Sequence, residues 1–317
     1  IRDRLGAADD PQPEAGAVME LAIPIRWAMG GVFATLVAAT ATTATLGRTH
    51  PALDLGEVRL RVRSWWVMAA AFIAALAVHR AITVVFLTLI GVAAVLELGR
   101  ATRMVLPAAL VSTLAGYGLA ATGHSSLLAW VIVAAPLVAA LVLVARGAVD
   151  GFVANVGATG VGAVVGVSLA HMAAILTLPA SAAYPAGGAG LLLFLVIVAQ
   201  GGDVAQFLTG KAFGRRKLAP HVSPNKTVAG LVGGVTIAAA LGIALGLLLT
   251  ERGWLWGGTV AAVIALAGAT GDLIVSAIKR DCGVKDAGTL IPGHGGILDR
   301  VDSLLLAAPL FFYVVSW

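Results

Sequence analysis

The 317-residue sequence has few charged residues, three tyrosines and one cysteine. Charged residues make up only 12% of the chain, whereas hydrophobic residues make up 59%. The single cysteine, Cys282, excludes an intrachain disulfide framework and a thiolate metal cluster. A mean hydropathy of +0.97 with long, nearly charge-free runs excludes an ordinary soluble domain. We therefore predict an all-α, polytopic integral membrane protein.

The sequence contains about ten apolar segments whose lengths are near the roughly 20 residues that a helix needs to span a bilayer. We predict transmembrane or membrane-embedded helices at 24–46, 65–78, 81–98, 104–121, 126–145, 152–177, 187–208, 227–250, 254–277 and 303–317. Residues 1–20 are polar and contain proline, so we expect a mobile tail there. The remainder is predicted to form one continuous membrane domain.

Basic residues gather in alternate connections between these segments. They lie in 47–64, 99–103, 209–226 and 278–302, which fall on one side of the membrane if each segment crosses once. Because basic loops stay in the cytoplasm, this side is predicted to be cytoplasmic, with the tail outside. This distribution and anionic lipid also account for the net charge of +5, so nucleic acid is not an expected partner.

Residues 56–66, GEVRLRVRSWW, alternate polar and apolar side chains before a tryptophan pair. In a strand-like register the arginines share one side, and we interpret the stretch as an interfacial anchor. Three GxxxG pairs predict close helix packing inside a subunit or across a dimer. These pairs are Gly162/Gly166, Gly230/Gly234 and Gly242/Gly246.

The apolar segment 254–277 contains an acid, Asp272. On a helix, Asp272, Ser276 and Lys279 form one stripe, with Arg280 beside it. An ionisable side chain at membrane depth is costly unless it faces a polar cavity, a partner or an ion. The stripe is therefore a candidate site, although an Asp272–Lys279 pair that merely neutralises itself is the alternative.

Charge is concentrated in 276–303, which holds four basic residues and four aspartates. Within it, the glycines of PGHGG (292–296) let backbone N–H groups approach a phosphate, and His294 can donate a hydrogen bond. Asp299 and Asp302 follow one turn apart, with Arg300 between them. Carboxylates of this kind suit Mg²⁺ and arginine suits phosphate.

A second polar cluster lies at 203–227 and includes Asp203 and a strongly basic loop. Its last part, SPNKT, is predicted to open the next helix, with Ser223 or Asn225 as the cap. Lys226 would then sit in the first turn, where a cation opposes the helix dipole but suits a bound anion.

These motifs together resemble the phosphatidate cytidylyltransferase family. The resemblance rests on the spacing from Ser276 through Lys279, Arg280, Lys285, Asp286, PGHGG, Asp299 and Arg300 to Asp302, together with Gly271-Asp272-Leu273 and SPNKT. It covers roughly 200–303. One departure is that Val228 and Ala229 follow SPNKT, where the family usually has an aromatic or aliphatic residue and then Glu, which suggests a divergent branch.

The resemblance implies transfer of a cytidylyl group from CTP to phosphatidic acid with Mg²⁺ or another divalent cation. It makes 201–317 the catalytic part and 21–200 the N-terminal membrane helices. The active site is expected to face the cytoplasm, and the resemblance also suggests a homodimer. Metal ligands would be Asp272, Asp299 and Asp302, with Asp203 as a further candidate. Catalytic residues would be Asp272, Lys279, Asp299, Arg300 and Lys226, and substrate-binding residues Lys211, Ser223, Asn225, Lys226, Ser276, Arg280, Lys285, Asp286, His294, Gly295 and Gly296.

Two alternatives stay open at this point, a different phosphorylated lipid as substrate and a transporter. The departure after SPNKT suggests the different lipid. The stretch 150–155 imitates the start of the CDP-alcohol phosphotransferase pattern, but Asn155 stands where that family has arginine and no spaced aspartates follow, so we interpret this likeness as coincidence. A transporter would also bury acids and His171 within spans, yet the polar residues gather in two loops instead of following a path through the bilayer.

Overall fold

The computed structural model describes residues 22–49, 56–148, 150–285, 287–288 and 295–317. The predicted tail (1–20), Asp286 and His294 therefore lie outside the described residues. The helices are α1 (Ile23–Thr49), α2 (Gly56–Val78), α3 (Arg80–Ala101), α4 (Leu106–Ala121), η1 (Ser125–Leu127), α5 (Leu128–Ala145), α6 (Phe152–Leu176), α7 (Gly187–Phe213), α8 (Val228–Leu249), α9 (Gly253–Asp281), α10 (Leu298–Val301) and α11 (Leu304–Ser316). Two short strands, β1 (Lys217–Ala219) and β2 (Ser223–Thr227), form an antiparallel hairpin between α7 and α8.

Eight helices in the described part of the chain are long and apolar enough to cross a membrane, and α4 is a shorter apolar helix. Each of the ten predicted segments corresponds to one helix. The prediction of an all-α, polytopic integral membrane protein is therefore confirmed.

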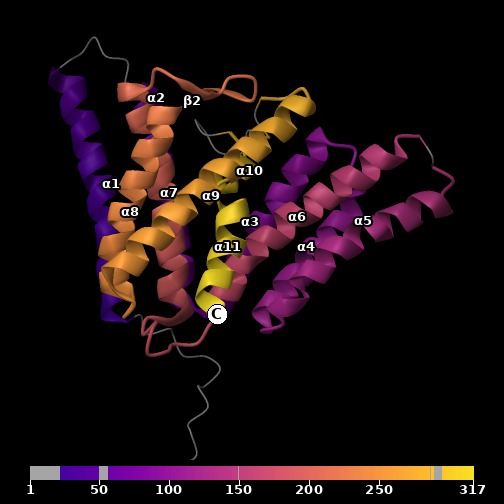
Figure 1. Cartoon of the computed structure of the whole chain (residues 1–317), viewed down its shortest axis with the longest axis horizontal. Coiled ribbons are helices and arrows are strands. Elements are labelled where there is room, and N and C mark those ends of the chain that lie inside the picture. The colour runs from indigo at the N-terminus through magenta and orange to yellow at the C-terminus, as the bar shows by residue number, and fades with distance from the viewer. Residues whose placement is uncertain (1–21, 50–55, 149, 286, 289–294) are drawn as a thin grey trace, which may run out of the picture.

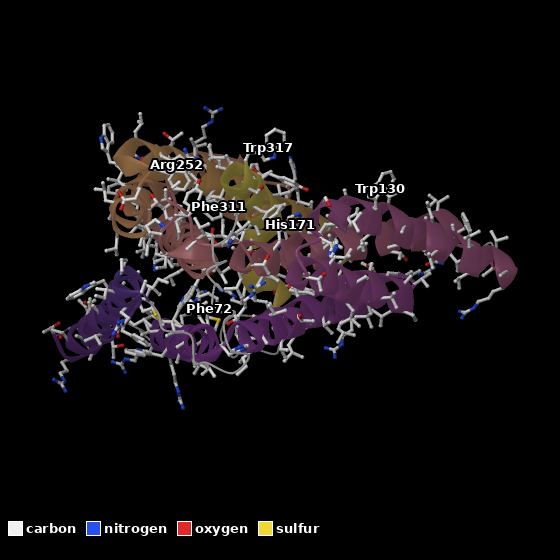
Figure 2. All side chains as sticks on the ribbon, turned by 90° about the horizontal axis from the view of Figure 1, so that it is seen from below. Phe72, Trp130, His171, Arg252, Phe311 and Trp317 are labelled. Carbon is white, nitrogen blue, oxygen red and sulfur yellow. The ribbon has the colours of Figure 1, made fainter. Side chains whose placement is uncertain are left out.

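The helices form two groups that meet at α11 (Figure 1). Helices α7, α8 and α9 pack in sequence, and α1 lies against α7 and α8. Helix α2 packs between α1 and α3, and α3, α4 and α5 pack against α6. Helix α11 contacts α6, α7 and α9, so it joins the groups. Phe311 of α11 stacks on Phe194 of α7 with ring centroids 5.5 Å apart. Figure 2 shows Phe311 and His171 in the interior, whereas Trp130 lies at the outside.

Glycines allow α8 and α9 to approach closely. A Cβ at Gly242 would overlap the carbonyl of Gly257 and the side chain of Ala261, both on α9. Gly230 and Gly234 pack in the same way on Gln206 of α7. The predicted GxxxG packing is thus found inside the subunit.

Two local predictions were wrong. Residues 56–66 are the first turns of α2 and not a strand-like segment, because they continue without a break into the apolar run that follows. SPNKT forms β2 and does not open α8; Thr227 is the N-cap, with its side chain accepting a hydrogen bond from Gly230 N at 3.1 Å. Strand β2 is held in place by pairing with β1, a contact that helix-start patterns do not encode.

The predicted basic connections share one side of the molecule. In Figure 1 the end of α1, the start of α2, the hairpin and the end of α9 lie along the upper edge, whereas the C-terminus lies at the lower edge. Asp272, Ser276 and Lys279 on the last turns of α9 therefore lie close to this basic side.

Candidate active site

Helix α9 carries the predicted polar stripe. Ser276 donates a hydrogen bond to Asp272 Oδ1 at 3.2 Å, and Lys279 lies one turn further along. Arg280 does not join them: it is exposed, and its Nη1 donates to the Val284 carbonyl at 3.1 Å beyond the helix end. The stripe is confirmed without Arg280.

Asp272 is paired with a lysine from another segment. Lys226 Nζ lies 2.6 Å from Asp272 Oδ2 and also donates to the Ala269 carbonyl at 3.3 Å. The Lys226 and Asp272 side chains are 12% and 27% exposed, so some Asp272 surface stays open to a ligand. Lys226 reaches Asp272 because β2 contacts α9. Lys226 directly precedes Thr227, which is the last residue of β2 and the N-cap of α8.

Lys279 is paired with Asp299 in the same manner. Its Nζ lies 2.5 Å from Asp299 Oδ1, and these side chains are 11% and 8% exposed. Asp299 Oδ2 accepts hydrogen bonds from Ala287 N at 3.1 Å and Gly296 N at 3.0 Å. Asp272 and Lys279 therefore do not simply neutralise each other, and each ties α9 to a different loop.

Glu97 of α3 is a site residue that the sequence analysis missed. Its Oε1 accepts from Ile297 N at 3.0 Å and its Oε2 from Leu298 N at 2.9 Å, and the residue is 4% exposed. The carboxylate thereby satisfies backbone donors at the start of α10. The signal was present, because Glu97 is an acid within a predicted span, as Asp272 is.

The described glycines of PGHGG face these carboxylates. Gly295 has a φ of +80°, which favours glycine, and a Cβ there would lie 2.8 Å from Asp299 Oδ2. A Cβ at Gly296 would overlap the Glu97 carboxylate. The lack of a side chain at these two glycines lets the backbone at 295–296 approach Asp299 and Glu97 closely.

Asp302 adds a third acid beside α9. It is 9% exposed, and Gly271 makes room for it, since a Cβ on Gly271 would lie 2.5 Å from the Asp302 carbonyl oxygen. Burial raises the pKa of Asp302 well above its usual value, and the nearby charges of Asp272 and Asp203 raise it further. The carboxylates of Asp203 on α7, Asp272 on α9 and Asp302 at the α10–α11 junction therefore repel one another.

The carboxylate oxygens of this acid cluster are ligands of the kind that a divalent cation binds. Among the residues that the structure describes, no three His, Cys, Asp or Glu side chains stand in a metal-binding arrangement. Carboxylate oxygens are nevertheless the ligands that Mg²⁺ prefers, and a cation would relieve the mutual repulsion at Asp302. Asp299 fits less well, because three donors already occupy its two oxygens.

The other predicted substrate-binding residues differ in how far they are exposed. Ser223 is half-buried, whereas Lys211, Asn225 and Lys285 are exposed. Arg300 is half-buried; burial lowers its pKa below the usual value, while Asp302 and Asp299 raise it. Gln200 of α7 donates to the Arg300 carbonyl at 3.4 Å, which was also not foreseen.

His171 of α6 lies away from this centre, as a packing residue would. It is 4% exposed, its Nδ1 lies 2.9 Å from the Val167 carbonyl oxygen, and its ring meets that of Phe312 with centroids 5.5 Å apart.

Comparison with known sequences adds an independent view. The profile that defines the cytidylyltransferase family matches residues 59–317. The protein YnbB of Escherichia coli, whose function is uncharacterized, is 38% identical over 289 residues, which cover 90% of this chain and 96% of that protein. Phosphatidate cytidylyltransferases of Brucella suis and Haemophilus influenzae are 44% and 42% identical over 122 and 135 residues. These matches cover 38% and 41% of this chain and 45% and 46% of those enzymes, less than half of their length.

Proposed function

The chain belongs to the cytidylyltransferase family, and from this premise we propose that it transfers a cytidylyl group from CTP to phosphatidic acid. A phosphate oxygen of the lipid attacks the α-phosphorus of CTP, and the bond to the β-phosphate breaks. The products are CDP-diacylglycerol and pyrophosphate. Two ion pairs, Lys226–Asp272 and Lys279–Asp299, carry the proposal. They bring the two predicted polar clusters, 203–227 and 276–303, together at α9.

The main task of such a site is to bring two polyanions into line. A phosphate monoester is largely dianionic near neutral pH, so the nucleophile needs little help from a general base. Lys226, Lys279 and Arg300 supply positive charge, and positioning with charge neutralisation dominates this chemistry. Lys211, Ser223, Asn225, Arg280 and Lys285 stay predicted contacts of the substrates.

We place a divalent cation at Asp272 and Asp302, with Asp203 as the third acid. A bound cation supplies neutralisation of the phosphate oxygens. Asp299 instead holds Lys279 and the backbone at Ala287 and Gly296 in position. The site would face the cytoplasm, since it lies near the basic connections.

A second candidate is transfer to a different phosphorylated lipid. Its one support is that Val228 and Ala229, which follow SPNKT, depart from the usual family pattern. The relatives whose names state an activity are phosphatidate cytidylyltransferases, and this favours phosphatidic acid as the acceptor. Both candidates share the same reaction on the CTP side.

One assay separates the two candidates. Purified protein is incubated with CTP, Mg²⁺ and one lipid from a panel of phosphorylated lipids, and the lipid product and pyrophosphate are measured. Phosphatidic acid is expected to give CDP-diacylglycerol with equimolar pyrophosphate, and a chelator is expected to stop the reaction until Mg²⁺ is restored. Product from another lipid alone would favour the second candidate, and no pyrophosphate with any lipid would contradict both.

A further inference from the structure

The arginines of helix α2 lie on two sides of the helix, one facing a cleft beside α1 and the other facing α7. Arg59 and Arg63 are one turn apart, so they share a face, and they line a cleft of about 440 Å³ between α1 and α2. Arg61 lies between them in sequence and about 200° around the helix from Arg59. It is half-buried, and its guanidinium carbon lies 5.4 Å from the ring centroid of Phe207 on α7.

Phe207 brings Arg61 to the edge of the active site. It lies one turn from Asp203 on α7, the helix whose Gln200 contacts the Arg300 carbonyl. Gln200 and Phe207 are seven residues apart, about two turns along one face of α7, so Arg61 and the Arg300 carbonyl lie against the same face of this helix. Arg61 and Arg300, one from each half of the chain, are thereby held beside the same stretch of α7.

The surface of α7 beside Arg61 is apolar and uncovered. Val204, Phe207 and Leu208 share one face of the helix and are 43%, 54% and 57% exposed. An arginine above such a strip matches an amphiphilic ligand, with a phosphate at the guanidinium and hydrocarbon along the helix.

We propose that Arg61, together with Arg300, binds the phosphate of the lipid substrate, whose acyl chains lie along Val204, Phe207 and Leu208. This rests on the proposed function and assigns the lipid to the α2–α7 side of the site. CTP then occupies the Lys226–Asp272 side. Guanidinium groups suit this role because their planar donors bind phosphate oxygens in pairs, and stacking on an aromatic ring fixes their orientation.

Kinetics of three variants test the assignment. The variants are Arg61→Gln, Arg61→Lys and the control Arg59→Gln, which removes an exposed charge two residues away. Arg61→Gln is expected to raise the phosphatidic acid concentration at half-saturation about tenfold while KM for CTP stays within about twofold, a loss of about 1.4 kcal/mol of binding free energy. Arg61→Lys keeps the charge without the paired donors and should fall between wild type and Arg61→Gln.

A binding measurement separates this inference from the proposed reaction. Native mass spectrometry of the detergent-solubilised variants, titrated with phosphatidic acid or phosphatidylcholine, reports lipid binding without turnover. Phosphatidic acid binding that weakens in Arg61→Gln but not in Arg59→Gln supports the inference even if the wild type makes no CDP-diacylglycerol. Equal effects of Arg61→Gln and Arg59→Gln, a raised KM for CTP, or a lower melting temperature with unchanged lipid binding would overturn it.

Discussion

Asp272 and Asp299 differ in what remains available on their oxygens. Asp272 is held by Lys226 and Ser276 and is 27% exposed, whereas Asp299 receives three donors and is 8% exposed. The same residue type is therefore partly open at one position, where we propose a cation, and is fully used by protein donors at the other. Sequence spacing treated the two as equivalent metal ligands, because it does not show how many donors reach each carboxylate.

At residue scale the first prediction concerns Asp272→Asn. The change keeps the shape but removes the negative charge that faces Lys226 and the proposed cation. We expect the turnover of CTP to fall about 100- to 1000-fold, the loss typical when one preorganised electrostatic contact is removed. Asp281→Asn, at the exposed end of the same helix, is the matched control and should keep near-normal activity. Normal turnover in Asp272→Asn would remove Asp272 from the site.

Glu97→Gln is the second prediction at this scale. An amide accepts through one oxygen only, so one of the N–H groups of Ile297 and Leu298 would lose its acceptor in a buried place. The cost in unfolding free energy is expected to be about 1–3 kcal/mol. Thermal unfolding in detergent measures it, with Glu251→Gln as an exposed control. An unchanged melting temperature in Glu97→Gln would show that this carboxylate does not hold the loop.

At the scale of elements, the hydrophobic runs predicted all eight helices that are long and apolar enough to cross a membrane in the described part of the chain, since a span needs about 20 apolar residues whatever its neighbours are. The same reasoning missed the hairpin, because the pairing of Lys217 with Thr227 depends on contact between segments. It also misjudged 56–66, where alternation mimics a strand. In the helix, Arg61 lies on a different side from Arg59 and Arg63, whereas in a strand all three would share one side.

The glycine contact of α8 with α9 carries the third prediction. In Gly242→Ala the new methyl group meets the Gly257 carbonyl and Ala261, so the helices must move apart. We expect a loss of about 1–3 kcal/mol in stability, as for other overpacked sites. Because Lys226 precedes α8 and Asp272 lies on α9, activity should fall together with the melting temperature. Gly30→Ala on α1, where nothing lies within 4 Å, is the control and should change neither.

At the scale of the whole molecule, the site draws on both sides of the predicted division at residue 200. Glu97 of α3 holds the start of α10, and Gln200 of α7 contacts the Arg300 carbonyl. The N-terminal helices therefore help to form the site. The predicted homodimer stays a prediction, and it loses one argument, because Gly230, Gly234 and Gly242 are used for packing inside the subunit.

Orientation in the membrane gives the last prediction. The hairpin and the end of α9 lie on the opposite side of the bundle from the α8–α9 connection (Figure 1). We expect the basic side to face the cytoplasm, where its charge favours retention. In a Cys282→Ser background, Arg215→Cys should react with a membrane-impermeant maleimide in inverted vesicles, and Glu251→Cys should react in intact spheroplasts. The reverse pattern would place the proposed site outside, away from cytoplasmic CTP, and labelling of both positions from one side would contradict the single crossing of α8.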